Sequence, residues 1–341
     1  MIFGELPLTE CTGAMLAHAI RIDGRRIAKG TSVDRGLIEA AERAGMHRLW
    51  IARLEAGDVP EDLAADRVAE MLAGSGIARR APSHGRVNLH AAHDGLLLYE
   101  PDAVIRANGQ CESIGISTMP VHTPVAAGDM LATIKVFPYA IGAAELGSLC
   151  QLLHRSLEVR PWQAGISACL IQTALYDTAP KQLAKTAAVT RARLARLGIS
   201  MVEPPIVAHA VEPLAQALVA ANAIAPAQAG LLLISGATAT SDRRDVLPAA
   251  IVAAGGSVTR FGMPVDPGNL IVMGRLGDAG LVVIGLPGCA KSPKRNGLDL
   301  VLERLAAGLP VDSADFDRMG VGGMLDEAGR TVPWAWAASA A

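Results

Sequence analysis

A short apolar run that ends in a loop of small residues is the feature that most limits what this chain can fold into. Residues 231–234 are all Leu or Ile, the loop at 235–245 mixes small, hydroxyl, acidic and basic residues, and a helix-like pattern starts at Val246. An apolar run bounded by a turn is typical of a buried strand, so we predict a strand–loop–helix unit. Small residues let the backbone approach a ligand, and a helix N-terminus attracts anions. The unit therefore favours binding of a phosphorylated small molecule.

The region around this unit alternates between strand and helix patterns. Over 161–310 we predict strands at 165–171, 231–234, 257–263, 270–275 and 281–284, and helices at 181–197, 212–222, 246–254 and 297–307. Residues 277–280, Gly-Asp-Ala-Gly, are typical of a hairpin turn. Alternation of this kind predicts an α/β fold with a mostly parallel sheet and helices on both faces, which is a three-layer α/β/α domain.

The rest of the chain predicts smaller modules. Residues 1–80 indicate a mixed α/β module, with helices at 35–45 and 63–73 and a strand at 47–53. Residues 81–160 indicate a β-rich module, with short strands at 87–89, 95–99, 103–105 and 130–137. Residues 311–341 form a polar and then Trp- and Ala-rich tail for which no element is predicted.

Composition excludes several classes of protein. A length of 341 residues suits two or three domains, and a net charge of -2 gives no general attraction to nucleic acid or to a membrane surface. Five scattered cysteines without a C-x-x-C pair argue against a zinc site or a disulfide framework. There is no signal-peptide pattern and no apolar run near the ~18 residues of a membrane span. We expect a cytoplasmic protein with no nucleic-acid or membrane partner.

Three small-residue loops follow predicted strands, at 235–245, 264–269 and 285–292. Loops after the carboxyl ends of parallel strands meet at one edge of a sheet, so we predict that all three outline one pocket. The third loop ends in Lys291-Ser292 but has Ala290 where a nucleotide P-loop requires glycine, so a P-loop is disfavoured. Lys291 either reaches a phosphate or is an ordinary solvated lysine.

Two acids in the first loop have two interpretations. Asp242 and Asp245 stand three residues apart at the predicted helix start. They could hold Mg²⁺, which prefers one or two carboxylates with substrate oxygens, or they could cap the helix. Arg243 and Arg244 could grip a phosphate or carboxylate, or pair with the same two acids.

The histidines give no convincing catalytic or metal group. His90 and His93 have a spacing that places them on opposite faces of a strand, and the other six histidines are isolated in the sequence. A structural or exposed pair is favoured over a metal site. No Ser/His/Asp or Cys/His grouping suggests nucleophilic catalysis.

Several of these motifs together resemble the molybdopterin-binding domains of molybdenum-cofactor biosynthesis. Thr238 with 244–248, Arg-Asp-Val-Leu-Pro, resembles the TGGTG…RDVTPE signature, and 286–288, Leu-Pro-Gly, resembles the family's LPG loop. Residues 263–269 resemble a segment of the molybdotransferase branch, and motifs at 13–17, 29–31 and 57–61 resemble its N-terminal part. The resemblance is strong over about 160–310 and looser over 1–80.

The resemblance implies an α/β domain that binds molybdopterin and acts in cofactor biosynthesis or maturation. In the family this domain adenylylates molybdopterin with Mg-ATP or inserts molybdate, so transferase activity, Mg²⁺ and ATP are implied, as is a homodimer with a molybdoenzyme or biosynthetic partner. Asp245, Asp242 and Lys291 would be catalytic, with Asp242 or Asp245 as the metal-binding acid. The ligand would be bound by Ser235, Gly236, Ala237, Thr238, Arg244, Pro267, Gly268, Asn269, Pro287, Gly288 and Ser292.

Departures from the family pattern leave two functions open. Ala237 and Ala239 stand where glycines are usual, one extra residue precedes Arg244, and Cys-Ala follows the LPG loop. The added methyl groups narrow the place where a ligand would touch backbone. The protein is therefore either an enzyme of adenylyl or molybdate transfer, or a carrier, sensor or insertion protein that binds the cofactor without turnover. A third reading is an unrelated nucleotide-binding α/β enzyme.

Overall fold

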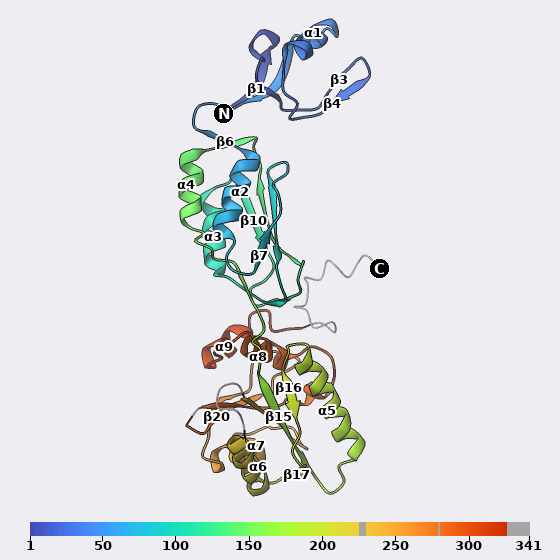
Figure 1. The fold of residues 1–341 in the computed structure, drawn as a ribbon, viewed down its shortest axis with the longest axis vertical. Coiled ribbons are helices and arrows are strands. Elements are labelled where there is room, and N and C mark those ends of the chain that lie inside the picture. Colours follow the sequence, from blue (N-terminus) through green and yellow to red (C-terminus); the bar gives the residue numbers. More distant parts are fainter. Residues whose placement is uncertain (225–229, 279, 326–341) are drawn as a thin grey trace. The chain divides into compact units, whose positions relative to one another are not determined.

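The chain divides into two compact units in a computed structural model, which describes residues 1–224, 230–278 and 280–325 (Figure 1). The first unit is 1–161 and the second is 162–341. Each unit has its own hydrophobic cores. No helix within the described part of the chain is both long enough and apolar enough to cross a membrane.

The first unit begins with a small three-stranded antiparallel sheet. Its order is β1-β5-β2, and a hairpin, β3-β4, and one helix complete this part. Strand β5 alternates buried and exposed residues at Arg48–Ile51, as a half-buried strand should. The core contains Leu8, Leu16, Leu49 and Ile51. The elements are β1 (Ile2–Pro7), a 3₁₀ turn (Leu8–Glu10), β2 (Met15–Leu16), β3 (Ile20–Ile22), β4 (Arg25–Ile27), α1 (Arg35–Arg43) and β5 (Arg48–Arg53).

A second core in this unit runs from Val59 to Val159. It lies among three further sheets, ordered β10-β12-β8-β7, β11-β9-β14 and β13-β6, and three helices. Residues on both sides of position 80, where the sequence suggested a division, fill this same core. The elements are β6 (Asp58–Pro60), α2 (Glu61–Leu72), β7 (Ile77–Arg79), β8 (Arg86–Ala91), β9 (Gly95–Leu98), α3 (Pro101–Gln110), β10 (Ile114–Thr118), β11 (Pro124–Val125), β12 (Met130–Val136), β13 (Ala140–Gly142), α4 (Ala143–Gln151) and β14 (Glu158–Arg160).

One predicted strand of this region was wrong. Residues 103–105 were expected to be extended, but they lie inside helix α3. Pro101 stands at the helix start, where a proline is well tolerated, and Ala103, Val104 and Ala107 face the core at helical spacing. The error arose because a short apolar run does not distinguish a strand from one face of a helix.

The second unit is built on a seven-stranded sheet, and its α/β class agrees with the prediction. The order is β16-β15-β18-β21-β20-β19, and β17 also pairs with β15. Strands β15 to β18 and β21 run parallel, whereas β19 and β20 are antiparallel to their neighbours. The strands are β15 (Ser167–Ala174), β16 (Ser200–Val202), β17 (Val207–Ala208), β18 (Gly230–Ser235), β19 (Ser257–Phe261), β20 (Val272–Leu276) and β21 (Leu281–Gly285).

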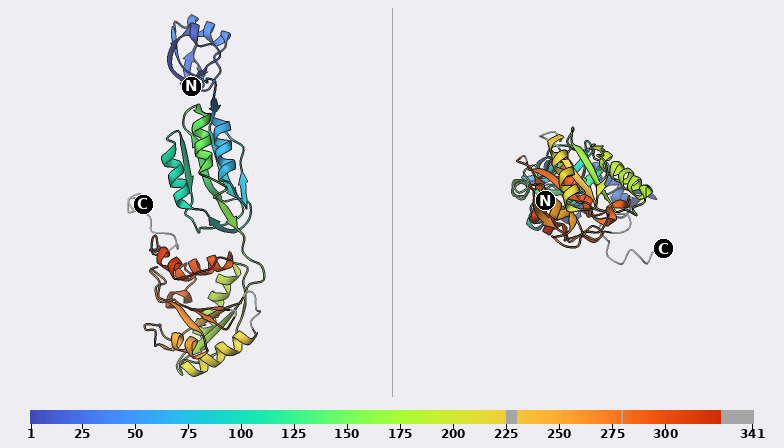
Figure 2. Two further views of the ribbon diagram at one scale, coloured as in Figure 1. Left: turned by 90° about the vertical axis from the view of Figure 1, so that its left-hand side faces the viewer. Right: turned by 90° about the horizontal axis from the view of Figure 1, so that it is seen from below.

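Helices cover both faces of this sheet and make three layers. In β18, Leu231 and Leu233 belong to one core, whereas Leu232 and Ile234 belong to the other, as the period of a strand requires. Helices α5, α8 and α9 contribute to the first core, and α6 and α7 to the second. In the left view of Figure 2, α8 and α9 (red) and α6 (yellow) lie on opposite sides of the strands. The helices are α5 (Pro180–Ala195), α6 (Val211–Ile224), α7 (Val246–Ala253), α8 (Gly297–Ala306) and α9 (Ser313–Met319).

The region after residue 311 contains an element that the sequence did not predict. Helix α9 begins with a capping box, in which Asp312 and Asp315 each accept a backbone N–H of the other. Phe316 and Met319 anchor the helix in the core beside α8. The remainder of the predicted tail, 326–341, lies outside the described residues.

Candidate functional site

The carboxyl ends of the parallel strands lie at one edge of the large sheet. Gln172 of β15 pairs with Ser235 of β18, and Ile234 pairs with Gly285 of β21. Because β20 is antiparallel to β21, its first residue, Val272, lies opposite Gly285. The loops at 236–245, 262–271 and 286–296 therefore all leave or enter the sheet at this edge, as expected from the sequence.

The first loop approaches its surroundings closely. A Cβ atom on Gly236 would come within 3.0 Å of the Thr238 carbonyl oxygen and 3.1 Å of a Leu247 methyl carbon. Ala237 is half-buried, and its N–H donates to Thr173 Oγ1 at 3.0 Å. Ser235 is buried in the last position of β18, whereas Thr238 is exposed. The order Gly-Ala therefore fits the loop: a side chain at the first position would be crowded, and the second position holds a methyl group.

A hydrogen-bonded chain of side chains crosses the sheet edge at this loop. Thr173 Oγ1 lies 2.8 Å from His209 Nδ1, and His209 Nε2 lies 2.8 Å from Thr238 Oγ1. Thr173 lies near the carboxyl end of β15. His209 directly follows β17, and β17 pairs with β15. Burial lowers the pKa of His209; Asp245 opposes this shift, and Lys291 adds to it. His209, Asp245 and Lys291 are thus close enough to influence one another.

Asp245 supports the start of helix α7. Its two carboxylate oxygens accept the N–H of Val246 at 2.7 Å and the N–H of Ser241 at 3.2 Å. This is the helix-capping interpretation of the residue. The capping role accounts for Asp245 without a ligand, and its catalytic role remains a prediction.

Asp242 is engaged by Arg244. Its Oδ1 accepts both the backbone N–H of Arg244 at 2.8 Å and the side-chain Nε–H at 2.7 Å. The side-chain hydrogen bond from Arg244 lowers the pKa of Asp242. Both side chains are exposed, so this pair stabilises the loop weakly. Of the two interpretations of Arg244, the structure shows the one in which it pairs with Asp242.

These contacts give no support to a Mg²⁺ site at Asp242 and Asp245. Each carboxylate already accepts hydrogen bonds within its own loop, one from Arg244 and the other from backbone N–H groups. Among the described residues, no group of three or more His, Cys, Asp or Glu side chains is arranged to hold a metal ion. A Mg²⁺ ion held by these two acids remains a prediction.

The third loop brings Lys291 to the first. Lys291 Nζ donates to the Gly236 carbonyl oxygen at 3.2 Å, and the Leu286 N–H donates to the Ile234 carbonyl at 2.8 Å. Pro287 is buried and precedes a 3₁₀ turn, Gly288–Lys291. Lys291 remains exposed, so its ammonium group is available beside the Gly236–Thr238 backbone.

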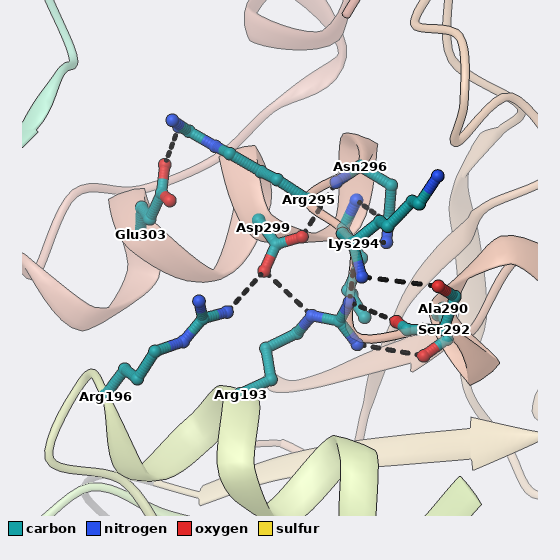
Figure 3. Close-up of polar contacts among 10 residues, drawn as sticks. Arg193, Arg196, Ala290, Ser292, Lys294, Arg295, Asn296, Asp299 and Glu303 are labelled. Atoms are coloured by element: carbon teal, nitrogen blue, oxygen red, sulfur yellow. Dashed lines mark hydrogen bonds and ion pairs between the residues drawn. The ribbon is translucent and has the colours of Figure 1, made fainter. Parts of the chain in front are cut away.

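A buried arginine holds this third loop in place. Arg193 of α5 donates to the carbonyl oxygens of Ala290, Ser292 and Lys294 and pairs with Asp299 of α8 at 2.8 Å. Figure 3 shows Arg193 and Arg196 both directed at the Asp299 carboxylate. The Arg193 side chain is only 2% exposed. The buried guanidinium group of Arg193 thus holds the backbone of the loop that carries Lys291.

The middle loop packs against the start of helix α8. The Gly297 N–H donates to the Pro267 carbonyl at 2.9 Å, and Gly268 has a φ of 144°, where a Cβ atom would collide with the Gly297 backbone. Asp266 and Asn269 line an open pocket of about 250 Å³, which is bounded on its other side by residues 320–324. Among the described residues, the backbone hydrogen bonds that leave this loop run to Gly297 of α8 and to residues 323 and 325, and none runs to 236–245.

The structure thus brings together some of the predicted site residues. Gly236, Ala237, Thr238 and Lys291 lie together, whereas Pro267, Gly268 and Asn269 lie beside α8. Ser292 contributes its carbonyl to Arg193. A shared ligand for all of these residues remains a prediction.

Three residues of the site were missed by sequence reasoning. Thr173, His209 and Arg193 stand 64, 29 and 97 residues from their respective partners Ala237, Thr238 and Ala290. The only available signal was position, because Thr173 is the second-last residue of β15 and His209 directly follows β17. The histidine pair at 90 and 93 makes separate contacts, with the carbonyls of Gly128 and Asp94.

No protein-family model matches the chain, and no curated protein matches its sequence. A solved structure that it resembles is the crystal structure of the molybdopterin biosynthesis MoeA protein from Pyrococcus horikosii. The two chains are 14% identical, the match covers 90% of this chain and 76% of that chain, and the TM-score is 0.30. A TM-score of this size does not indicate a shared function.

Proposed function

We propose that the second unit binds molybdopterin through its phosphate at the carboxyl edge of the large sheet and acts in molybdenum-cofactor biosynthesis or maturation. The proposal is supported above all by the meeting of Lys291 with the Gly236–Thr238 loop, because these segments carry the sequence resemblance. An exposed ammonium group beside small residues at a strand–loop–helix turn suits a phosphate oxygen. The exposed Thr238 hydroxyl adds a further polar group at the same place.

Binding without turnover is the form of this function that the loop geometry favours. Asp245 caps α7, and Asp242 is paired with Arg244, so neither acid is prepared for Mg-dependent adenylyl transfer. A carrier, sensor or insertion protein needs the anion contacts but not a metal-binding acid. Adenylyl or molybdate transfer is the second candidate, since the LPG loop and Lys291 are retained. The expected homodimer and its biosynthetic or molybdoenzyme partner remain predictions.

Asp245→Asn separates the two candidates. Asparagine caps a helix as well as aspartate does, and its Oδ1 can accept the Val246 N–H, but its amide nitrogen cannot accept the Ser241 N–H. The substitution therefore removes the charge together with the longer, 3.2 Å hydrogen bond. Purified protein would be incubated anaerobically with molybdopterin and Mg-ATP, and bound pterin and adenylylated product would be measured by fluorescence after oxidation. A carrier retains bound pterin in both proteins and forms no product. Product that disappears in Asp245→Asn would instead establish a transferase.

Lys291→Ala tests the site itself. A hydrogen bond to a charged group contributes about 1.5–3 kcal/mol, so we expect affinity for molybdopterin to fall by roughly 10- to 150-fold. Lys185→Ala, which removes an exposed lysine from the outer part of α5, is the control and should bind as the unmodified protein does. Equal affinity of both variants, or no pterin binding by the unmodified protein, would refute the proposed site.

A further inference from the structure

The hydrogen bonds around Thr173 determine which nitrogen of His209 carries a proton. Thr173 is buried, with 1% of its surface exposed, and its hydroxyl accepts the Ala237 N–H. A hydroxyl has a single hydrogen to donate, and within the described residues the only acceptor in contact with Thr173 Oγ1 is His209 Nδ1. The opposite tautomer would leave this buried hydrogen without a partner among the described residues, which is unfavourable. His209 Nδ1 is therefore the acceptor.

The same reasoning sets the direction of the next bond. A neutral imidazole whose Nδ1 accepts must carry its hydrogen on Nε2, and His209 Nε2 lies 2.8 Å from Thr238 Oγ1. The Nε2–H therefore donates to Thr238. Among the described residues, no acceptor lies within hydrogen-bond distance of the Thr238 hydroxyl hydrogen. The Thr238 side chain is exposed at the sheet edge. This hydrogen is left to donate to solvent or to a ligand, in the same loop in which the Gly236 carbonyl accepts from Lys291.

We propose that His209 is a positioning residue that holds Thr238 as a hydrogen-bond donor toward an oxygen of the bound phosphate. This inference rests on the proposed function for the identity of the ligand. A donor at Thr238 favours an acceptor oxygen over an ammonium group, which has no lone pair, at the same point. By donating to the Thr238 oxygen, His209 thus leaves the Thr238 hydroxyl hydrogen to act as a donor.

The charge of the surroundings agrees with a neutral His209. The groups that act on it are Asp245, at the start of α7, and Lys291, in the loop after β21, and the net effect with burial lowers its pKa. At neutral pH the ring then has one proton, so that the tautomer decides which partner is the donor. A protonated ring would lose this distinction because both nitrogens would donate.

The tautomer can be measured without any ligand. In ¹⁵N-histidine-labelled full-length protein at neutral pH, we expect Nδ1 of His209 to have the chemical shift of an unprotonated ring nitrogen and Nε2 that of a protonated one. The resonances would be assigned by their loss in His209→Gln. Thr173→Val, which removes the donor hydroxyl and preserves shape, should return His209 to a mixture of tautomers. The opposite tautomer in the unmodified protein would overturn the inference.

Binding completes the test, with molybdopterin as the probe. Glutamine can place an amide N–H near the position of His209 Nε2, so His209→Gln should bind within about threefold of the unmodified protein. His209→Ala and Thr238→Val should each weaken binding by roughly tenfold, and the double variant no further, because both remove the same donor. Full affinity in His209→Ala overturns the inference. The expected tautomer in a protein that binds no pterin would instead refute the proposed function and leave the orientation of Thr238 standing.

Discussion

Arg193 shows how a single residue determines the shape of the candidate site. It is a charged side chain inside the unit, and it satisfies three carbonyl oxygens of the loop that carries Lys291 as well as the carboxylate of Asp299. A buried charge is tolerated only when it is paired and fully hydrogen-bonded. Removing Arg193 alone would therefore leave its buried partners without their hydrogen bonds.

Replacement of Arg193 should be among the most destabilising single changes in the second unit. Arg193→Met leaves Asp299, 5% exposed, as a buried charge whose remaining contacts are Arg196 at 3.5 Å and the backbone N–H of Asn296 at 2.8 Å. We expect the free energy of unfolding to fall by roughly 3–5 kcal/mol, as measured by urea denaturation. Arg196→Met is the matched control, because this side chain is 63% exposed; it should cost less than about 1 kcal/mol. Similar losses in both variants would contradict the assigned role.

Glu303 should make stability depend on pH. Burial raises its pKa from 4.5 to about 7, although Arg295 lies 2.6 Å from its carboxylate. Between these two pH values the folded protein binds a proton that the unfolded chain does not. The resulting stabilisation is complete below pH 4.5 and is lost as the pH rises through about 7.

The stability profile of Glu303→Gln isolates this contribution. The difference in unfolding free energy between the unmodified protein and the variant should fall by up to roughly 3 kcal/mol from pH 4.5 to 7.5. Glu39→Gln, at a position that is 56% exposed, is the control and should show no such change. A constant difference for Glu303→Gln over this range would disprove the prediction.

At the scale of the element, helix α5 contains two buried threonines in unlike situations. Thr186 donates its hydroxyl hydrogen to the Gln182 carbonyl at 3.0 Å, whereas the Thr190 hydroxyl is fully buried and has no partner among the residues that the structure describes. An unpaired buried hydroxyl loses its hydrogen bonds to water and gains none. Substitution of these two threonines by valine can thus distinguish the effect of side-chain shape on stability from the effect of hydrogen bonding.

Thr190→Val should therefore stabilise the protein. Valine has nearly the shape of threonine and a similar helix propensity, so the change mainly removes the unpaired hydroxyl. We expect the free energy of unfolding to rise by about 1 kcal/mol. Thr186→Val removes a hydroxyl that has a partner and should be neutral or destabilising. The argument fails if both substitutions change thermal stability in the same direction by the same amount.

Elements were the level at which sequence reasoning was most accurate. In the second unit the predicted pattern at 181–197 corresponds to α5, that at 231–234 to β18 and that at 246–254 to α7. These segments have long apolar faces or clear turns at their ends. Residues 103–105 and helix α9 were missed, since the first is a short run and the second is anchored by only Phe316 and Met319.

At the scale of the whole molecule, the chain is two units with separate cores. No buried cluster mixes residues from 1–161 with residues from 162–341 in the described part of the chain. Each unit thus holds the apolar contacts that stabilise it. We expect at least two transitions when the full-length protein is unfolded by heat.

Separate expression of residues 162–341 would test this independence. The fragment should unfold cooperatively and should bind molybdopterin with the affinity of the full chain, because every residue of the candidate site lies within it. Circular dichroism would follow unfolding, and pterin fluorescence after oxidation would follow binding. A fragment that stays unfolded, together with a single transition in the full-length protein, would show that the units depend on each other.

The sequence by itself determined the class of the fold and the places where a ligand could be bound. Continuous apolar runs and helical periodicity are local properties, so the sequence predicted an α/β domain over 161–310 with small-residue loops after its strands. The same local signals indicated Lys291 and the Gly236–Thr238 loop as candidates. They also left the roles of Asp242 and Asp245 open, since one pattern of acids suits both capping and metal binding.

Only the tertiary structure decided which side chains meet. Thr173, His209 and Thr238 come together because β17 and β18 both pair with β15, and a run of apolar residues does not encode which strands become neighbours. Arg193 reaches the Lys291 loop because α5 packs on the sheet face shared with α8. The partners of a side chain depend on strand order, register and layer, and these are set by the packing of the whole unit.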